Sequence, residues 1–196
     1  MKNIIFDLGG VLIDLQADKT IKCFGKNITA FYNKGEDKLF IEIAHKFERA
    51  EISAEIFRQK VCEIYNLNFS DEKFDYCWNA MIGEMTNKRT VLLQNLRKKY
   101  RIFLLSNTNE IHYRFFTAQK YWNENLFERV YFSHLLGMRK PEHRIFNFVL
   151  SENNLLPTET LFFDDNAENV EAAKELGINA IQVTSEIVDL CNNINL

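Results

Sequence analysis

The strongest constraint on the fold of this chain is a pattern of three short apolar runs, each ending in a cluster of polar residues. The runs lack strict alternation with polar residues, which is typical of strands buried on both faces of a parallel sheet. Two similar runs lie at 130–132 and 180–183. In a parallel sheet, ligands bind beyond the carboxyl ends of the strands, where the polar clusters would lie. The three runs and their polar ends are 3–6 with Asp7, 102–105 with 106–109, and 161–163 with 164–166.

Stretches with helical spacing separate the later runs. We expect helices over Thr90–Tyr100, from Pro141 onward, and over Glu168–Leu176, with Gly177 closing the last one. Strands that alternate with helices predict an α/β protein with a doubly wound, Rossmann-like parallel sheet.

Residues 15–88 break this alternation, because they read as helical and contain no buried-strand pattern. We therefore expect a core domain of residues 1–14 and 89–196, with residues 15–88 inserted as a helical cap domain. The helices expected in the insert are Lys38–Arg49, Ala54–Tyr65 and Asp71–Met81, with Ser53 and Ser70 as the N-caps of the last two.

Charge and cysteine usage exclude several classes of protein. The chain has 24 basic and 27 acidic residues, a net charge of −3, which argues against a broad nucleic-acid surface. Its apolar runs are too short for a signal peptide or a membrane span, so we expect no membrane partner. The four cysteines show no CxxC or zinc-finger spacing, and we interpret them as free, mostly buried thiols of a cytoplasmic protein. They are Cys23, Cys62, Cys77 and Cys191.

The polar clusters, taken in order, resemble the four motifs of the haloacid dehalogenase-like (HAD) hydrolases. Each motif alone is weak evidence, but all four occur in order, each at a predicted strand end. The helical insert resembles the small cap that subfamily IA carries between its first two motifs. Segments 106–109, 137–142 and 162–166 are most similar to the α-D-glucose-1-phosphate phosphatase-like branch. The matching residues are 6–12, Ser106-Asn107, Lys140-Pro141, and Asp164-Asp165-Asn166 with Asn169.

The resemblance implies a Mg²⁺-dependent phosphatase that acts on a small phosphorylated metabolite. A carboxylate can attack an anionic phosphate ester only when the negative charge is neutralised, and Mg²⁺ prefers oxygen ligands. By the same resemblance, Asp164 is a candidate helper beside the metal. The implied roles are Asp7 as nucleophile; Asp7, the Gly9 carbonyl and Asp165 as metal ligands; and Ser106, the Asn107 N–H at a helix start, and Lys140 as phosphate-binding groups.

One position departs from the pattern of the family's phosphatases. They usually carry an Asp two residues after the nucleophile, which protonates the leaving oxygen and then activates water, whereas this chain has Gly9. Such general acid–base help is worth about 10²- to 10⁴-fold in rate. Three explanations stay open: a good leaving group, such as the anomeric oxygen of a sugar-1-phosphate; a substitute side chain; or loss of catalysis. The candidate substitutes are His112, His45, Glu48 and Arg49.

Two other functions compete with the phosphatase. A 2-haloacid dehalogenase also lacks the second Asp, but dehalogenases of this superfamily use no magnesium and do not keep paired carboxylates such as Asp164-Asp165. A binding or regulatory protein on the same fold is the other alternative. The sequence leaves the exact substrate and the oligomeric state open. Cap residues that could contact the substrate, although most belong in the cap's own core, are Phe24, Phe31, Phe40, Phe47, Trp78 and Met81.

Overall fold

Five parallel strands form one sheet in the described part of the chain, in the order β3-β2-β1-β4-β5. The computed structural model describes residues 1–25, 38–194 and 196. Each strand overlaps one of the five predicted apolar runs, and the expected α/β, Rossmann-like fold is confirmed. The strands are β1 (Asn3–Phe6), β2 (Arg101–Ser106), β3 (Arg129–Phe132), β4 (Thr160–Asp164) and β5 (Asn179–Gln182).

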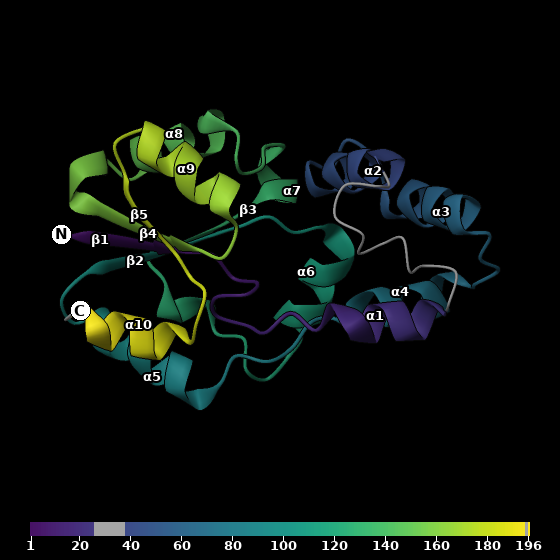
Figure 1. Cartoon of the computed structure of the whole chain (residues 1–196), viewed down its shortest axis with the longest axis horizontal. Coiled ribbons are helices and arrows are strands. Elements are labelled where there is room, and N and C mark those ends of the chain that lie inside the picture. Colours follow the sequence, from purple (N-terminus) through teal and green to yellow (C-terminus); the bar gives the residue numbers. More distant parts are fainter. Residues whose placement is uncertain (26–37, 195) are drawn as a thin grey trace.

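Both faces of the sheet are covered by helices, which explains why the strands are apolar without alternation. In β1, Ile4 and Phe6 pack into the core on one face, and Ile5 packs into the core on the other. Figure 1 shows α8 and α9 on one side of the sheet, and α5 and α10 on the other. These helices are α5 (Asn87–Leu96), α8 (His143–Glu152), α9 (Ala167–Glu175) and α10 (Ile187–Asn193).

The insert forms a separate helical layer beyond the carboxyl ends of the strands (Figure 1). Its own core is aromatic, with the rings of Phe47 and Phe57 stacked at 4.3 Å. The N-caps predicted from sequence are confirmed, since Ser53 accepts from the Ile56 N–H and Ser70 from the Lys73 N–H. Phe31, a predicted cap residue, lies outside the described residues. The cap helices are α1 (Ala17–Phe24), α2 (Lys38–Glu48), α3 (Ala54–Tyr65) and α4 (Asp71–Asn79).

Two helix starts differ from the sequence prediction. Helix α5 begins before Thr90, because the Thr86 hydroxyl accepts from the Arg89 N–H and caps it there. The domain boundary predicted between 88 and 89 therefore falls in the first turn of α5. Pro141 lies in a turn, and α8 begins after it. Short elements complete the description: α6 (Glu110–Thr117), α7 (Ser133–Leu136), and the 3₁₀ turns Glu124–Leu126 and Pro157–Glu159. No helix among the described residues has the length and apolar character needed to cross a membrane.

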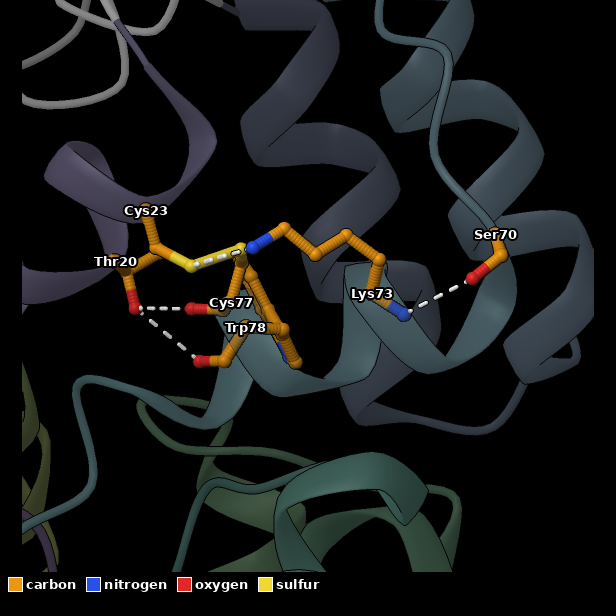
Figure 2. The surroundings of a disulfide bond; sticks show 6 residues. All are labelled: Thr20, Cys23, Ser70, Lys73, Cys77 and Trp78. Carbon is orange, nitrogen blue, oxygen red and sulfur yellow. Dashed lines mark hydrogen bonds between the residues drawn. A yellow bond between two sulfur atoms is a disulfide. The ribbon is translucent and has the colours of Figure 1, made fainter.

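A disulfide bond between Cys23 and Cys77 shows that the expectation of four free thiols is wrong. The two cysteines are 54 residues apart in sequence, but α1 packs beside α4 and brings their Cα atoms to 5.2 Å. Figure 2 shows that the Thr20 hydroxyl also fastens α1 to the end of α4, donating to the Cys77 carbonyl at 2.9 Å. Sequence spacing could not reveal this pair, because only helix packing creates it. Cys62 and Cys191 are free, and the cytoplasmic location stays a prediction.

We expect reduction of this disulfide to destabilise the protein. Because the bond closes a loop of 54 residues, the chain-entropy model gives a loss of roughly 4 kcal/mol in the free energy of unfolding. Urea unfolding with and without dithiothreitol measures this loss. Cys62→Ser should respond to dithiothreitol as the wild type does, whereas Cys77→Ser should not respond. Equal urea midpoints for oxidised and reduced wild type would contradict the expectation.

Candidate active site

The buried ammonium of Lys140 joins the ends of three neighbouring strands. Its Nζ donates to Asp7 Oδ1 at 2.6 Å, to Asp164 Oδ2 at 2.5 Å and to the Leu105 carbonyl at 2.9 Å. Asp7 follows β1, Asp164 ends β4, and Leu105 lies in β2, so the contacts cross the middle of the sheet. Lys140 is 1% exposed, and its three donors are all used. The structure thus brings together Asp7 and Asp164 at neighbouring strand ends, as predicted, and Lys140 reaches them from a turn that follows α7.

Asp164 and Asp165 are adjacent in sequence but differ in their surroundings. Asp164 is fully buried and accepts from the Asn169 Nδ2 at 3.0 and 3.1 Å and from the Asn166 N–H at 2.8 Å, besides Lys140. The Asp165 carboxylate is exposed and, among the residues that the structure describes, takes hydrogen bonds from the backbone at Asp165 and Asn166 but none from a side chain. Asp164 therefore holds its neighbours in place, whereas the exposed Asp165 carboxylate is open to a ligand.

The three carboxylates of Asp7, Asp164 and Asp165 can hold a metal ion between them. Each offers an oxygen that lies within 4.8 Å of the others. Gly10 makes room for this cluster, because a Cβ there would lie 2.5 Å from Asp165 Oδ2, and its φ of +74° also favours glycine. The sequence analysis assigned no role to Gly10, although the Gly-Gly pair after Asp7 was a visible signal of a tight turn.

The charge balance of this cluster favours a cation. Burial raises the pKa of Asp7 to about 7, with Lys140 opposing the rise and Asp164 adding to it. Burial and the charge of Asp164 also raise the pKa of Asp165. For Lys140, burial alone would lower the pKa, but Asp164 and Asp7 outweigh it and raise the value, so the ammonium is retained. Three carboxylates facing one ammonium leave excess negative charge, and oxygen ligands of this kind fit Mg²⁺.

Asn107 holds the backbone of Lys140 in place, a role that the sequence did not indicate. Its side-chain amide donates to the Lys140 carbonyl at 2.8 Å and accepts from the Lys140 N–H at 2.9 Å. The expected position of Asn107 at a helix start is wrong, because Asn109 is the residue that caps α6. The buried Ser106 hydroxyl makes only a long contact, 3.4 Å, to the Asn107 carbonyl. It therefore remains available to a ligand.

Ser133 fixes the loop that follows β2 and was also missed from the sequence. Its hydroxyl accepts from the Thr108 N–H at 2.9 Å and donates to the Thr108 carbonyl at 2.8 Å. The residue is fully buried at the start of α7, so the Ser106-Asn107 segment is tied to the neighbouring strand end.

The backbone at Gly9 would accept a side chain, but Leu15 occupies the space. A Cβ built on Gly9 would lie 2.9 Å from Leu15 Cδ1, and its φ lies outside the left-handed region. Because this contact is with the far end of a flexible side chain, a larger residue would require only a shift of Leu15. The role of the Gly9 carbonyl as a metal ligand stays a prediction.

A cavity of about 260 Å³ lies between the cap and the carboxyl ends of the strands. The core contributes Gly9, Ser106 and Asn107, and the cap contributes mainly apolar side chains. Of the predicted cap residues, Phe24 lies in the cap's own core and does not line the cavity. Those that line it are Phe40, Phe47, Trp78 and Met81, together with Glu48 and, from α6, His112.

His112 does not have the protonation behaviour of an acid at neutral pH. Its ring stacks on Trp78 at 5.0 Å, and its Nδ1 lies 2.9 Å from Asn79 Oδ1. Burial lowers the pKa of His112 to about 3, so the ring is neutral and brings no imidazolium proton to a leaving group. His45 does not line the cavity, and burial together with the charge of Arg139 lowers its pKa as well.

Comparison with known proteins identifies the family of this chain. The model of a family described as haloacid dehalogenase-like hydrolase matches residues 1–177. This chain belongs to that family. The resemblance drawn from the four motifs is confirmed.

Three similar proteins carry a named activity or a bound ligand. A D-ribitol-5-phosphate phosphatase from Bacteroides thetaiotaomicron is 31% identical over 188 residues, which are 93% of this chain and 91% of that protein. A crystal structure of a HAD family enzyme from the same species, in complex with magnesium and inorganic phosphate, has a TM-score of 0.84 and 32% identity, covering 97% of this chain and 98% of that chain. A sesquiterpene phosphatase from Aspergillus oryzae is 25% identical over 195 residues, 95% of this chain and 91% of that protein.

We expect the affinity of this HAD-family site for Mg²⁺ to fall as the pH is lowered through the raised pKa of Asp7. A proton on Asp7 must leave before the carboxylate can bind a cation, so protonation competes with the metal below a pKa of about 7. From about pH 8 to about pH 6, the affinity should fall about tenfold. Isothermal titration calorimetry measures this change, and Asp7→Asn should bind Mg²⁺ more weakly but with a flatter pH dependence. An affinity for wild type that is constant over this range would contradict the expectation.

Proposed function

We propose that this chain is a magnesium-dependent phosphatase that hydrolyses a small phosphate monoester through an aspartyl-phosphate on Asp7. The observation that carries the proposal is the cluster of Asp7, Asp164 and Asp165 around Lys140, beside a cavity of molecular size. The phosphatase names of two relatives, and the magnesium and phosphate bound in a related structure, support the same activity.

The residues of this chain divide the chemistry between them. A carboxylate oxygen of Asp7 attacks the phosphorus, the bond from phosphorus to the ester oxygen breaks, and the released oxygen takes a proton from solvent water. Water then attacks the phosphorus of the aspartyl-phosphate, which releases phosphate and restores Asp7. The Lys140 ammonium offsets negative charge on the transferred group, and the Ser106 hydroxyl and Asn107 N–H donate hydrogen bonds to its oxygens.

Magnesium fits the acidic side of this site. Asp7, the Gly9 carbonyl and Asp165 would hold the ion, since the exposed Asp165 carboxylate, unlike that of Asp164, takes no side-chain hydrogen bond among the described residues. When bound, Mg²⁺ supplies positive charge that neutralises the phosphate and the carboxylates around it. Asp164 acts as a helper by holding Lys140 and Asn169 in place.

A sugar phosphate is the substrate that best agrees with Gly9. An anomeric oxygen is a good leaving group and needs little protonation, so a sugar-1-phosphate tolerates the missing acid. The relative named for D-ribitol-5-phosphate adds sugar-alcohol phosphates to the set to be tested. His112 does not replace the acid, because its low pKa keeps the ring neutral.

Phosphate release from a panel of sugar-1-phosphates and sugar-alcohol phosphates tests the proposed activity. We expect turnover that stops when EDTA removes Mg²⁺ and that falls at least about 10³-fold in Asp7→Asn. The exposed Asp18 gives a matched control, and Asp18→Asn should retain full activity. A folded protein that binds Mg²⁺ but releases no phosphate would favour a binding role, and magnesium-independent halide release from a haloacid would favour a dehalogenase.

An acid restored at position 9 should broaden the substrate range of this site. We expect Gly9→Asp combined with Leu15→Ala, which clears the contact at 2.9 Å, to raise turnover of alkyl phosphates by about 10-fold or more. Sugar-1-phosphates should gain less, because their leaving group needs less protonation. Leu15→Ala alone is the control for the altered cavity. If the double variant hydrolyses alkyl phosphates no faster than this control, the missing acid at Gly9 does not limit their turnover.

A further inference from the structure

We propose that Glu48, assisted by His112, binds hydroxyl groups of the substrate's leaving alcohol, so that the site selects polyhydroxylated phosphate esters. This inference rests on the phosphatase function proposed above, and it names the part of the substrate that the cap recognises. Its basis is the composition of the cavity wall away from the phosphate end.

The cavity wall is mostly apolar, and Glu48 is the one charged side chain among the described residues that line it. Ser106 and Asn107 line the same cavity from the core side, where the phosphate would bind. Pockets of this kind use apolar side chains for contact area, and a few polar groups for orientation and specificity. Glu48 is placed to be such a group for whatever part of the ligand extends toward the cap.

An ion pair fixes the orientation of Glu48 and occupies only one of its two carboxylate oxygens. It ends α2, and its Oε2 accepts from the Nε of Arg139 at 2.7 Å. Its side chain is 24% exposed, and no donor among the described residues lies within hydrogen-bond distance of Oε1. Oε1 is therefore free to accept a hydrogen bond from a substrate hydroxyl, and a bond to a charged acceptor is stronger than one between neutral groups.

His112 offers a second acceptor in the same wall. Its Nδ1 lies 2.9 Å from Asn79 Oδ1, which is an acceptor. The tautomer with the proton on Nδ1 fits this contact, and it leaves the lone pair on Nε2. The ring also lies flat on Trp78, which fixes its plane. Two fixed acceptors suit an alcohol with several hydroxyl groups.

The same groups discriminate against other phosphate esters. An ester of a purely apolar alcohol leaves Glu48 without a donor, and a site built to bind a hydroxyl rejects an analogue that lacks it. An ester with a second phosphate or a carboxylate at that end places like charges together. We therefore expect the order of preference to be polyol or sugar monophosphates first, then deoxy analogues, and then apolar or doubly anionic esters.

Glu48→Leu tests the assignment. The control substrate is p-nitrophenyl phosphate, which has no hydroxyl group that Glu48 could bind. For a hydroxylated phosphate ester, kcat/KM should fall about 10- to 100-fold, the range for a hydrogen bond to a charged group. With p-nitrophenyl phosphate it should change less than about twofold. His112→Phe, which keeps the stacking on Trp78, should cost about 3- to 10-fold on the same ester.

Glu142→Leu is the matched control. Glu142 pairs with Arg49 at 3.2 Å and, like the pair of Glu48 with Arg139, this ion pair joins the cap to the core, but Glu142 does not line the cavity. If Glu48→Leu and Glu142→Leu lower activity on all substrates alike, Glu48 only fastens the cap and the inference is overturned. It is also overturned if the wild type prefers the phosphate ester of an apolar alcohol, such as a prenyl monophosphate.

Binding to Asp7→Asn separates this inference from the proposed function. Calorimetry in that background, with a sugar-alcohol phosphate and Mg²⁺, should show a loss of affinity of about 10- to 100-fold when Glu48→Leu is added. This result without any wild-type turnover would retain the hydroxyl site and reject the phosphatase. Wild-type turnover of p-nitrophenyl phosphate, with no effect of Glu48→Leu on binding or turnover of polyol esters, would retain the phosphatase and reject the hydroxyl site.

Discussion

The buried contact of Lys140 with Asp7 and Asp164 is the interaction on which the rest of the site depends. It joins the ends of β1 and β4 at 2.6 and 2.5 Å and reaches the Leu105 carbonyl on β2. Removing one partner of such a buried group leaves an uncompensated charge, which typically costs about 3–5 kcal/mol. The side chain of Asn107 bonds both the N–H and the carbonyl of Lys140. Because Asn107 follows β2, this strand also helps to position the Lys140 ammonium.

The site has more carboxylates than cationic groups. This excess negative charge is the reason why the fold suits the proposed chemistry. Asp165 adds a third carboxylate. Burial is the main cause of the raised pKa of Asp7, and the charges of Asp164 and Asp165 add to it. A divalent cation and a phosphate ester can complete the charge balance together. Arg139, the chain neighbour of Lys140, pairs with Glu48 on the cap. Two adjacent residues of one loop therefore hold the two proposed groups: Arg139 orients Glu48, and Lys140 contacts Asp7.

The sequence predicted what depends on local pattern. The apolar runs of β1, β2 and β4 were visible because these central strands are buried on both faces. Asp7, Ser106 and Asp164 were expected together because parallel strands end at one edge. Contacts made only by packing were not visible. The disulfide joins cysteines 54 residues apart on two helices, and the hold of Asn107 on Lys140 spans 33 residues with no spacing rule. The same is true of Glu48, whose place in the cavity depends on how the cap sits over the strands.

Trapping of the covalent phosphoenzyme tests the central role of Asp7 most directly. A ³²P-labelled substrate is mixed with the enzyme and Mg²⁺, the reaction is quenched with acid within the first turnover, and the labelled peptide is identified by mass spectrometry. The proposed mechanism predicts label on the peptide that contains Asp7, its removal by neutral hydroxylamine, and its absence from Asp7→Asn. Phosphate release during the first turnover with no label on Asp7, or with label on another residue, would contradict nucleophilic attack by Asp7.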